Sequence, residues 1–338
     1  MSTPTFPETP RSDGLLADDE DDWNDEPALD QGEPERGTGS LASFAKGVVR
    51  PADVALLSDL DREAAARVAA EWPGLPEATR ERLVRTMDDL VEDRVDLTFG
   101  RVLRLALDDP SPVVRQLAIA ALWEDERPDL IEPLRDLLAR DPSQDVRAEA
   151  ARALGRFARL AESGELPETT GRLLRDELVA VLSDDLHPAL LRQRALEAAA
   201  VFARDPAITT MILDAYEADD QAWQGSALFA MGQTHDGAWL PTVMEELAGP
   251  DALLRYEAAR ACGLLGDEAA VPELLEAAAD EDTEVRHAAI GALGQIGGRA
   301  AIRALQSLSA TAIEADQEAI EAALEEAFAT SDLFGSVT

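Results

Sequence analysis

The most reactive side chains in this sequence are one cysteine, Cys262, and three histidines, His187, His235 and His287. A thiolate can act as a nucleophile, and imidazole nitrogens bind metal ions or carry protons. The four residues lie far apart in the sequence, however, and a metal site needs several ligands that converge on one place. A reactive thiol also needs electropositive surroundings, which an acidic chain does not favour. We therefore expect no catalytic residue, no metal and no cofactor, and a buried apolar role for Cys262.

Four arginines form a second candidate site. Arg152, Arg156 and Arg159 follow one another at helical spacing, and Arg260 stands on a comparable helix later in the chain. In an otherwise acidic protein, such a basic stripe could bind an acidic partner. The same arginines could instead pair with neighbouring carboxylates, which is the interpretation we favour for surface arginines. The stripe is thus a candidate partner-binding site with internal ion pairing as its alternative.

The N-terminal stretch differs in composition from the rest of the chain. Residues 1–40 contain 12 acidic and 2 basic side chains together with five prolines. Low hydrophobicity with high net charge does not offset the entropy of ordering, so we predict a disordered acidic tail. Within it, Trp23 follows two leucines and a run of carboxylates, a pattern that could dock into a basic, apolar groove. The alternative is a tail that only adds solubility.

Charge and hydropathy exclude several kinds of partner. The formal net charge is −38, of which −10 belongs to residues 1–40. Phosphate backbones and anionic lipid headgroups repel such a chain, so we expect neither nucleic-acid nor membrane binding. No apolar run approaches the length of a spanning helix, no secretory signal opens the sequence, and a single cysteine fits a reducing compartment. We expect a cytoplasmic monomer that binds a protein partner.

A repeat organises the chain from about residue 76. Each unit has an arginine or glutamine that we number position zero: Arg115, Arg147, Arg192, Gln224, Arg255, Arg286 and Gln317. The spacing is 31 or 32 residues except for one interval of 45. Alanine stands three and six residues after position zero in the first six units, and four units have glycine eight residues after it, at Gly155, Gly232, Gly263 and Gly294. Small residues at these offsets share one helix face and let a neighbouring helix approach closely.

Signals for helix ends recur with the same period. Four residues before position zero, five units carry good N-cap residues: Ser111, Ser143, Asp220, Asp251 and Asp282. Pro133, Pro241 and Pro272 suit the first turn of a preceding helix, and Gly266 and Gly297 suit helix ends. Each unit is thus predicted to be two antiparallel helices, which must stack on neighbouring units to bury both faces.

We therefore predict an all-α fold, an α-solenoid or superhelix of about seven helix-turn-helix repeats. The expected domains are an acidic tail at 1–40, a helical lead-in at 41–75, the repeat array at 76–328 and a C-terminal tail at 329–338. The interval of 45 residues implies an insertion of about 13 residues, which we place near 160–175.

The sequence of one unit resembles HEAT repeats. The block Thr283 to Gly294 has a Val-Arg pair, two alanines at helical spacing and a final Leu-Gly, and the short period is most similar to the phycobilisome-lyase type of HEAT-like repeat. The resemblance implies that the position-zero arginines pair with acidic groups of the turns and form a ladder between units. It assigns this structural role to Arg115, Arg147, Arg192, Arg255 and Arg286.

The expected function is that of a non-enzymatic scaffold or adaptor. Such a solenoid would bind its protein partner on the concave face, and the acidic surface would steer basic partners toward it. A further hypothesis is autoinhibition, in which residues 13–26 fold onto the arginine stripe.

Two enzyme groups that share the repeat are the alternatives. Bilin lyases attach a linear tetrapyrrole to a cysteine of a client protein, and deoxyhypusine hydroxylase is a di-iron oxidoreductase. The hydroxylase interpretation is disfavoured because its His-Glu ligand pairs are missing; the equivalent pairs here are Tyr256-Glu257 and His287-Ala288. Nothing in the sequence is diagnostic of the lyase reaction, so either activity would rest on the fold alone.

Overall fold

The predicted all-α solenoid is confirmed by a computed structural model that describes residues 40–310 and 313–335. All regular secondary structure in these ranges is helical. The α-helices are α1 Pro51–Ala55, α2 Arg62–Glu71, α3 Glu77–Asp93, α4 Gly100–Ala106, α5 Pro112–Ala121, α6 Ile131–Arg140, α7 Gln144–Glu162, α8 Glu168–Ser183, α9 Ala189–Ala199, α10 Pro206–Tyr216, α11 Gln221–Gln233, α12 Leu240–Leu247, α13 Ala252–Leu265, α14 Val271–Ala277, α15 Thr283–Ile296, α16 Gly298–Ser309 and α17 Glu314–Gly335.

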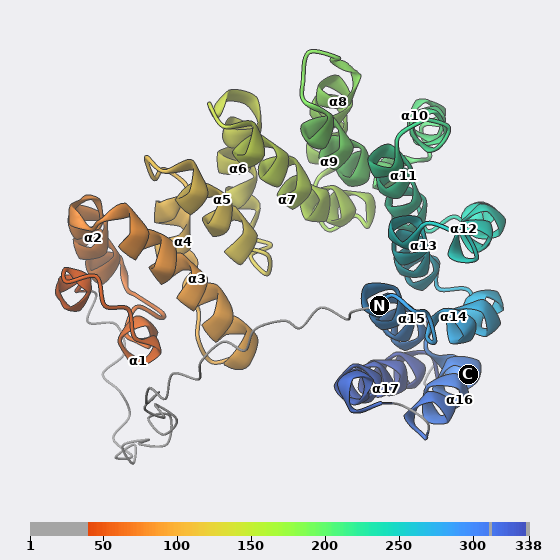
Figure 1. Cartoon of the computed structure of the whole chain (residues 1–338). Helices are drawn as coiled ribbons and strands as arrows, with labels where there is room; N and C mark the ends of the chain where they lie inside the picture. The colour runs from red at the N-terminus through yellow and green to blue at the C-terminus, as the bar shows by residue number, and fades with distance from the viewer. Residues whose placement is uncertain (1–39, 311–312, 336–338) are drawn as a thin grey trace, which may run out of the picture.

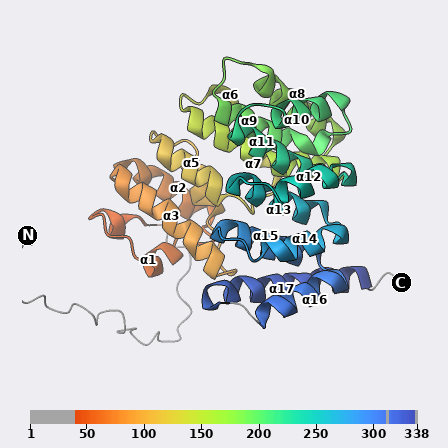
Figure 2. The ribbon, with the colours of Figure 1, turned by 45° about the vertical axis from the view of Figure 1, so that its right-hand side comes forward.

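The helices form two layers of an open arch (Figure 1). From α4 onward, the even-numbered helices make the outer layer and the odd-numbered helices make the inner layer. Each inner helix from α5 to α17 contains one position-zero residue, packs on the inner helices of adjacent repeats and carries the outer helix of its own repeat. Figure 2 shows the repeats following one another as a stack. The inner helices therefore form the concave face of the solenoid.

Helix boundaries lie where the repeating signals predict them. The side chains of Asp220, Asp251 and Asp282 accept hydrogen bonds from backbone N–H groups in the first turns of α11, α13 and α15. Ser143 does the same for α7 at 3.5 Å. Gly266 ends α13 in the left-handed region with φ of +69°, a conformation that costs residues with a Cβ more than it costs glycine.

The repeating glycines set how closely the inner helices approach. Each glycine eight residues after position zero faces the alanine six residues after position zero in the next repeat. A Cβ added at Gly232 would lie 2.8 Å from the Cα of Ala261, and one added at Gly263 would lie 3.0 Å from the Cα of Ala292. Gly155 and Gly294 make the equivalent contacts with the next inner helix. The four pairs of inner helices that meet at these glycines are the most closely packed pairs of neighbouring inner helices.

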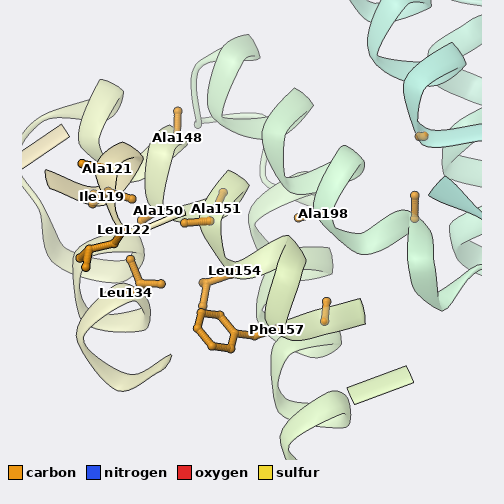
Figure 3. Close-up of a cluster of buried hydrophobic side chains, with 14 of the residues drawn as sticks. Ile119, Ala121, Leu122, Leu134, Ala148, Ala150, Ala151, Leu154, Phe157 and Ala198 are labelled. Atoms are coloured by element: carbon orange, nitrogen blue, oxygen red, sulfur yellow. The ribbon is translucent and has the colours of Figure 1, made fainter. Parts of the chain in front are cut away.

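Larger apolar side chains fill the space between the layers. Figure 3 shows Leu122, Leu134, Leu154 and Phe157 between α5, α6 and α7, all of them almost completely buried. Alanines such as Ala150 line the helix contacts around them. The core thus combines leucine between layers with alanine and glycine between repeats, which accounts for the low aromatic content.

The long interval between Arg147 and Arg192 is taken up largely by helix. Helix α7 has 19 residues and α8 has 16, and the turn at 163–167 joins them within the predicted insertion. At the other end, α17 continues through Gly335, so helix rather than a separate tail follows residue 328. Thr330, near the start of this extension, lies close to Gly297 at the end of the preceding inner helix. The tail at 1–40, with Trp23, lies outside the described residues except for Ser40. No helix within the described ranges combines the length and the hydropathy that crossing a bilayer requires.

Candidate functional site

Three position-zero arginines are bonded to an aspartate of the following repeat. Arg115 donates to both carboxylate oxygens of Asp141 at 2.7 Å, and Arg255 donates to those of Asp280 at 2.7 and 2.9 Å. Arg286 donates to Asp316 at 3.3 Å. Asp141 and Asp280 each stand six residues before the next position zero, where they also accept a hydrogen bond from the backbone two residues on. The hydrogen bond from Arg255 holds the pKa of Asp280 below its usual range.

The ladder is interrupted in the middle of the array. The residues six before the next position zero are Leu186 and Ala218, so Arg147 and Arg192 have no aspartate to reach there. Arg147 instead donates to the carbonyl oxygen of Leu138 at 2.7 Å. Arg192 donates to a backbone carbonyl at the end of α8 and pairs with the side chain of Asp185, in the turn before its own helix, at 2.8 Å. These two arginines therefore join the two helices of their own repeat, and they reach the following repeat through rings rather than an aspartate: Arg147 lies near His187, and Arg192 lies over the ring of Trp223, 5.3 Å from its centre.

The cysteine is part of the packed core. Cys262 has no exposed surface, and burial, with a smaller contribution from Glu273, raises the pKa of its thiol to about 12. The thiol is therefore protonated at neutral pH and is not poised for nucleophilic attack.

The three histidines lie in different repeats and serve separate contacts. The ring of His235 lies 2.8 Å from the carbonyl oxygen of Leu264, and that of His287 lies 3.0 Å from the carboxylate of Asp316. His187 lies 3.4 Å from a guanidinium nitrogen of Arg147. Across the described part of the chain, histidine, cysteine and carboxylate side chains form no group of three suited to holding a metal ion.

The four arginines of the basic stripe, by contrast, line one pocket on the concave face. Arg152, Arg156 and Arg159 reach it from α7, and Arg260 reaches it from α13. The cavity measures about 280 Å³. Its wall also includes side chains that were not predicted as binding residues: Trp123, Arg194, Glu197, Phe229, Gln233 and Glu257.

Three of the pocket arginines are paired with carboxylates of their own helix. Arg194 lies 2.6 Å from Glu197, Arg260 lies 2.9 Å from Glu257, and Arg152 pairs with Glu149. Burial raises the pKa of Glu257 above its usual value, with the nearby Glu197 adding to the effect. The Arg260 guanidinium also lies over the ring of Phe229, 4.6 Å from its centre. Internal ion pairing thus accounts for Arg152, Arg194 and Arg260.

Arg156 and Arg159 are not paired in this way. Arg156 is only 9% exposed, and its Nη1 donates to the carbonyl oxygen of Trp123 at 3.3 Å. Its Nε and Nη2 are buried and have no hydrogen-bond partner among the described residues. Burial lowers the pKa of Arg156 to about 10, so the side chain remains a cation at neutral pH. Arg159 is exposed at the mouth of the pocket, and its side chain bonds to no described residue.

Pocket residues that were not predicted from the sequence stand at recurring offsets from position zero. Arg194 and Glu257 stand two residues after position zero, Glu197 and Phe229 stand five after it, and Gln233 stands nine after it. These offsets share one helix face, which is the face turned to the concave side. Reading these offsets across repeats would have revealed charge pairs at positions two and five in three of the units.

The pocket is the middle of a longer groove. It shares Arg159, Val201 and Gln233 with a cavity of about 630 Å³ on one side. It shares Phe229, Gln233 and Arg260 with a second cavity of about 630 Å³ on the other. Asp236 lines the first of these cavities together with Glu162, which is paired with Arg204 at 3.2 Å, and Glu284 lines the second. The groove therefore crosses the inner helices from α7 to α15, basic in the middle and with carboxylates on both flanks.

Comparison with known proteins shows that two stretches of the chain match a repeat family. The family profile described as HEAT repeats matches residues 101–173 and 240–325. A search of curated protein sequences finds no match.

Solved structures provide distant likenesses. The chain is similar to human deoxyhypusine hydroxylase in complex with glycerol, with 23% identity over 85% of this chain and 98% of that chain and a TM-score of 0.35. It is also similar to the complex of CpcE and CpcF of phycocyanin lyase from Nostoc sp. PCC7120, with 19% identity over 68% of this chain and 95% of that chain and a TM-score of 0.44. Scores this low carry no argument about activity.

Proposed function

Because the chain carries HEAT repeats, we propose that it is a scaffold or adaptor that binds a protein partner along its concave groove. The observation that supports this most directly is the continuity of the groove, since three cavities that share lining residues together extend from α7 to α15. A groove that crosses several helices offers an extended surface to a peptide or a helix, in the manner of solenoid proteins. In this role the chain acts as a cytoplasmic monomer and needs no cofactor.

The charge of the chain indicates which kind of partner it would attract. The net charge of −38 attracts basic proteins, and at physiological ionic strength this attraction decays over a Debye length of about 8 Å. Carboxylates on the flanks of the groove, such as Asp236 and Glu284, extend this attraction into the binding surface. Electrostatic steering raises the association rate more than it raises the affinity.

The lyase and oxidoreductase alternatives need groups that converge on a substrate, and the described residues supply no specific observation in their favour. Protein purified from its native host distinguishes them cheaply. Stoichiometric iron in elemental analysis or a bilin band in the absorption spectrum would support an enzyme and would count against the scaffold.

Affinity capture from the native host tests the scaffold proposal. Gly291 lines the groove on α15, and a Cβ added there meets no atom within 4 Å. Gly291→Trp therefore places a bulky ring in the groove without forcing the helices apart. Gly74→Trp is the matched control, because a Cβ at Gly74 also meets nothing and this residue lies in the turn between α2 and α3.

We expect wild type and Gly74→Trp to capture the same protein and Gly291→Trp to lose it. Equal capture by all three would show that the partner binds elsewhere, and capture of no specific protein by wild type would contradict a scaffold role.

A further inference from the structure

Resting on the proposed function, we propose that the pocket around Arg156 binds the carboxylate of one acidic residue in a basic, aromatic-containing segment of the partner. This defines the chemistry of the contact at the centre of the groove. Three features of the pocket support it in turn: the guanidinium edge of Arg156, the aromatic rings beside it and the carboxylates around it.

The first feature is the edge of the Arg156 guanidinium formed by Nε and Nη2, which has no hydrogen-bond acceptor in the described part of the chain. Arg115 and Arg255 hold Asp141 and Asp280 through their Nε and Nη2 atoms, with bonds of 2.7 to 2.9 Å. In Arg156 the same two atoms are buried and make no hydrogen bond to any described residue. A buried cation with two unsatisfied donors is costly, and a planar carboxylate satisfies both donors at once. Both atoms lie beneath the pocket surface, so a partner carboxylate that displaces the atoms covering them would make the interaction that the ladder makes internally.

The second feature is the aromatic wall. Trp123 is 50% exposed at the pocket, and the ring of Phe229 lies under the guanidinium of Arg260. Glycine occupies the Trp123 position in four other repeats, so the close helix contact of those repeats is replaced here by an indole. An aromatic or aliphatic side chain next to the ligand's carboxylate would bury its surface against these two rings.

The third feature is the surrounding negative charge. Glu197 and Glu257 line the same pocket, so a dianionic phosphate would bring its second charge close to them. Beyond the pocket, Asp236 and Glu284 line the flanks of the groove, whereas Glu162 is paired with Arg204 of the same cavity at 3.2 Å. This arrangement of charges favours a ligand segment that brings one carboxylate into the pocket and carries basic residues on either side of that carboxylate. They disfavour the chain's own acidic run from Asp18 to Asp22 as the occupant.

Fluorescence anisotropy with the full-length chain tests this inference. The probe is a labelled short peptide with one glutamate beside a phenylalanine and two lysines at each end, and the control peptide has glutamine in place of glutamate. The variants are Arg156→Gln and Arg159→Gln. Arg172→Gln is the matched control, because Arg172 pairs with Glu168 on the outer helix α8.

We expect wild type and Arg172→Gln to bind the glutamate peptide about tenfold or more tightly than the glutamine peptide, as a charge-assisted bidentate contact requires. Arg156→Gln should bind both peptides equally, and Arg159→Gln should lose about threefold because its charge is exposed to solvent. A circular dichroism melt verifies that each variant is folded. Persistence of the glutamate preference in folded Arg156→Gln would overturn the assignment. Should Arg156→Gln not fold, Arg156→Met takes its place, and persistence of the glutamate preference in that folded variant would overturn the assignment instead.

A further variant separates the partner from the chain's own tail. It carries Asp18→Asn, Asp19→Asn, Glu20→Gln, Asp21→Asn and Asp22→Asn, and we expect its affinity for the glutamate peptide to equal that of wild type. Binding that appears only in this variant would show that the tail fills the pocket and would overturn assignment to a partner. Loss of the captured partner in Gly291→Trp together with no glutamate preference would leave the scaffold proposal standing and remove only this inference.

Discussion

The guanidinium of Arg255 holds the carboxylate of Asp280 through two hydrogen bonds of 2.7 and 2.9 Å. The carbonyl oxygen of the same aspartate accepts a third bond, at 3.1 Å, from Arg286 of the next repeat. One residue therefore ties together two consecutive position-zero arginines. Asp109 is placed in the same way between Arg80 and Arg115 near the other end of the array.

Asp280→Asn should destabilise the fold by about 2 kcal/mol at pH 7, because it leaves the buried donors of Arg255 without their charged acceptor. The pKa of Asp280 is lower in the folded protein than in the unfolded chain. The stabilisation is therefore fully present above the unfolded pKa of about 4 and is lost as the pH falls through the folded pKa. Urea unfolding at pH 7 and at successively lower pH measures the difference between wild type and variant.

Asp219→Asn is the control for this measurement, because Asp219 is exposed and bonds to no described residue. Its free energy of unfolding should match that of wild type within about 0.5 kcal/mol. A loss for Asp280→Asn that does not shrink at low pH would show that the carboxylate charge is not what stabilises the contact.

Gly232→Ala and Gly291→Ala should have opposite effects on stability. The added methyl group at residue 232 would lie 2.8 Å from the backbone of Ala261 and should cost about 1 to 3 kcal/mol. At residue 291 it meets no atom within 4 Å, and alanine should stabilise the helix by up to about 1 kcal/mol. Thermal melts of the two variants measure the contrast, and equal shifts would contradict the close glycine contact between repeats.

Replacing Arg156 by methionine should stabilise the protein by about 1 kcal/mol or more, since it removes a buried cation with two unsatisfied donors. The lowered pKa of Arg156 has the same origin, because burial makes the folded state hold this charge less readily than the unfolded chain does. Arg152→Met should destabilise instead, because it leaves the largely buried carboxylate of Glu149 without its partner. Chemical denaturation of both variants tests this, and a destabilised Arg156→Met would mean that the fold needs the cation.

Cys262 should resist alkylation in the native protein. Its pKa of about 12 and its complete burial leave almost no accessible thiolate at pH 8. Iodoacetamide labelling followed by mass spectrometry should show modification only after denaturation in urea. Rapid labelling of the folded chain would place the thiol in an accessible, activated setting that the packing around it does not provide.

The repeat explains why much of the fold could be predicted from sequence. Gly232 and Gly263 recur at one offset because each inner helix meets its neighbour at the same point, and Asp251 and Asp282 recur because each inner helix begins with the same cap. Such positions repeat in the sequence because they repeat in space. The extension of α17 to Gly335 was not visible in this way, since its contact with Gly297 belongs to the end of the array alone.

The pocket was harder to predict because it is specific to one part of the array. Arg156 and Arg260 were noticed as charges, but the sequence does not reveal that Arg156 lacks a carboxylate partner while Arg260 has one. Whether an arginine is satisfied depends on which residues adjacent helices bring beside it. The contribution of Phe229 depends on its distance from a helix one repeat away, which no local pattern encodes.

Site-specific photo-crosslinking tests the central claim most directly. Phe229 is replaced by benzoylphenylalanine, which preserves an aromatic ring in the groove, and the outer-layer residue Leu213, which is 40% exposed on α10, is replaced in a parallel sample. After illumination in native-host lysate, we predict a crosslink to one specific protein from residue 229 and none from residue 213. A specific crosslink from residue 213 alone would contradict the concave groove as the binding surface.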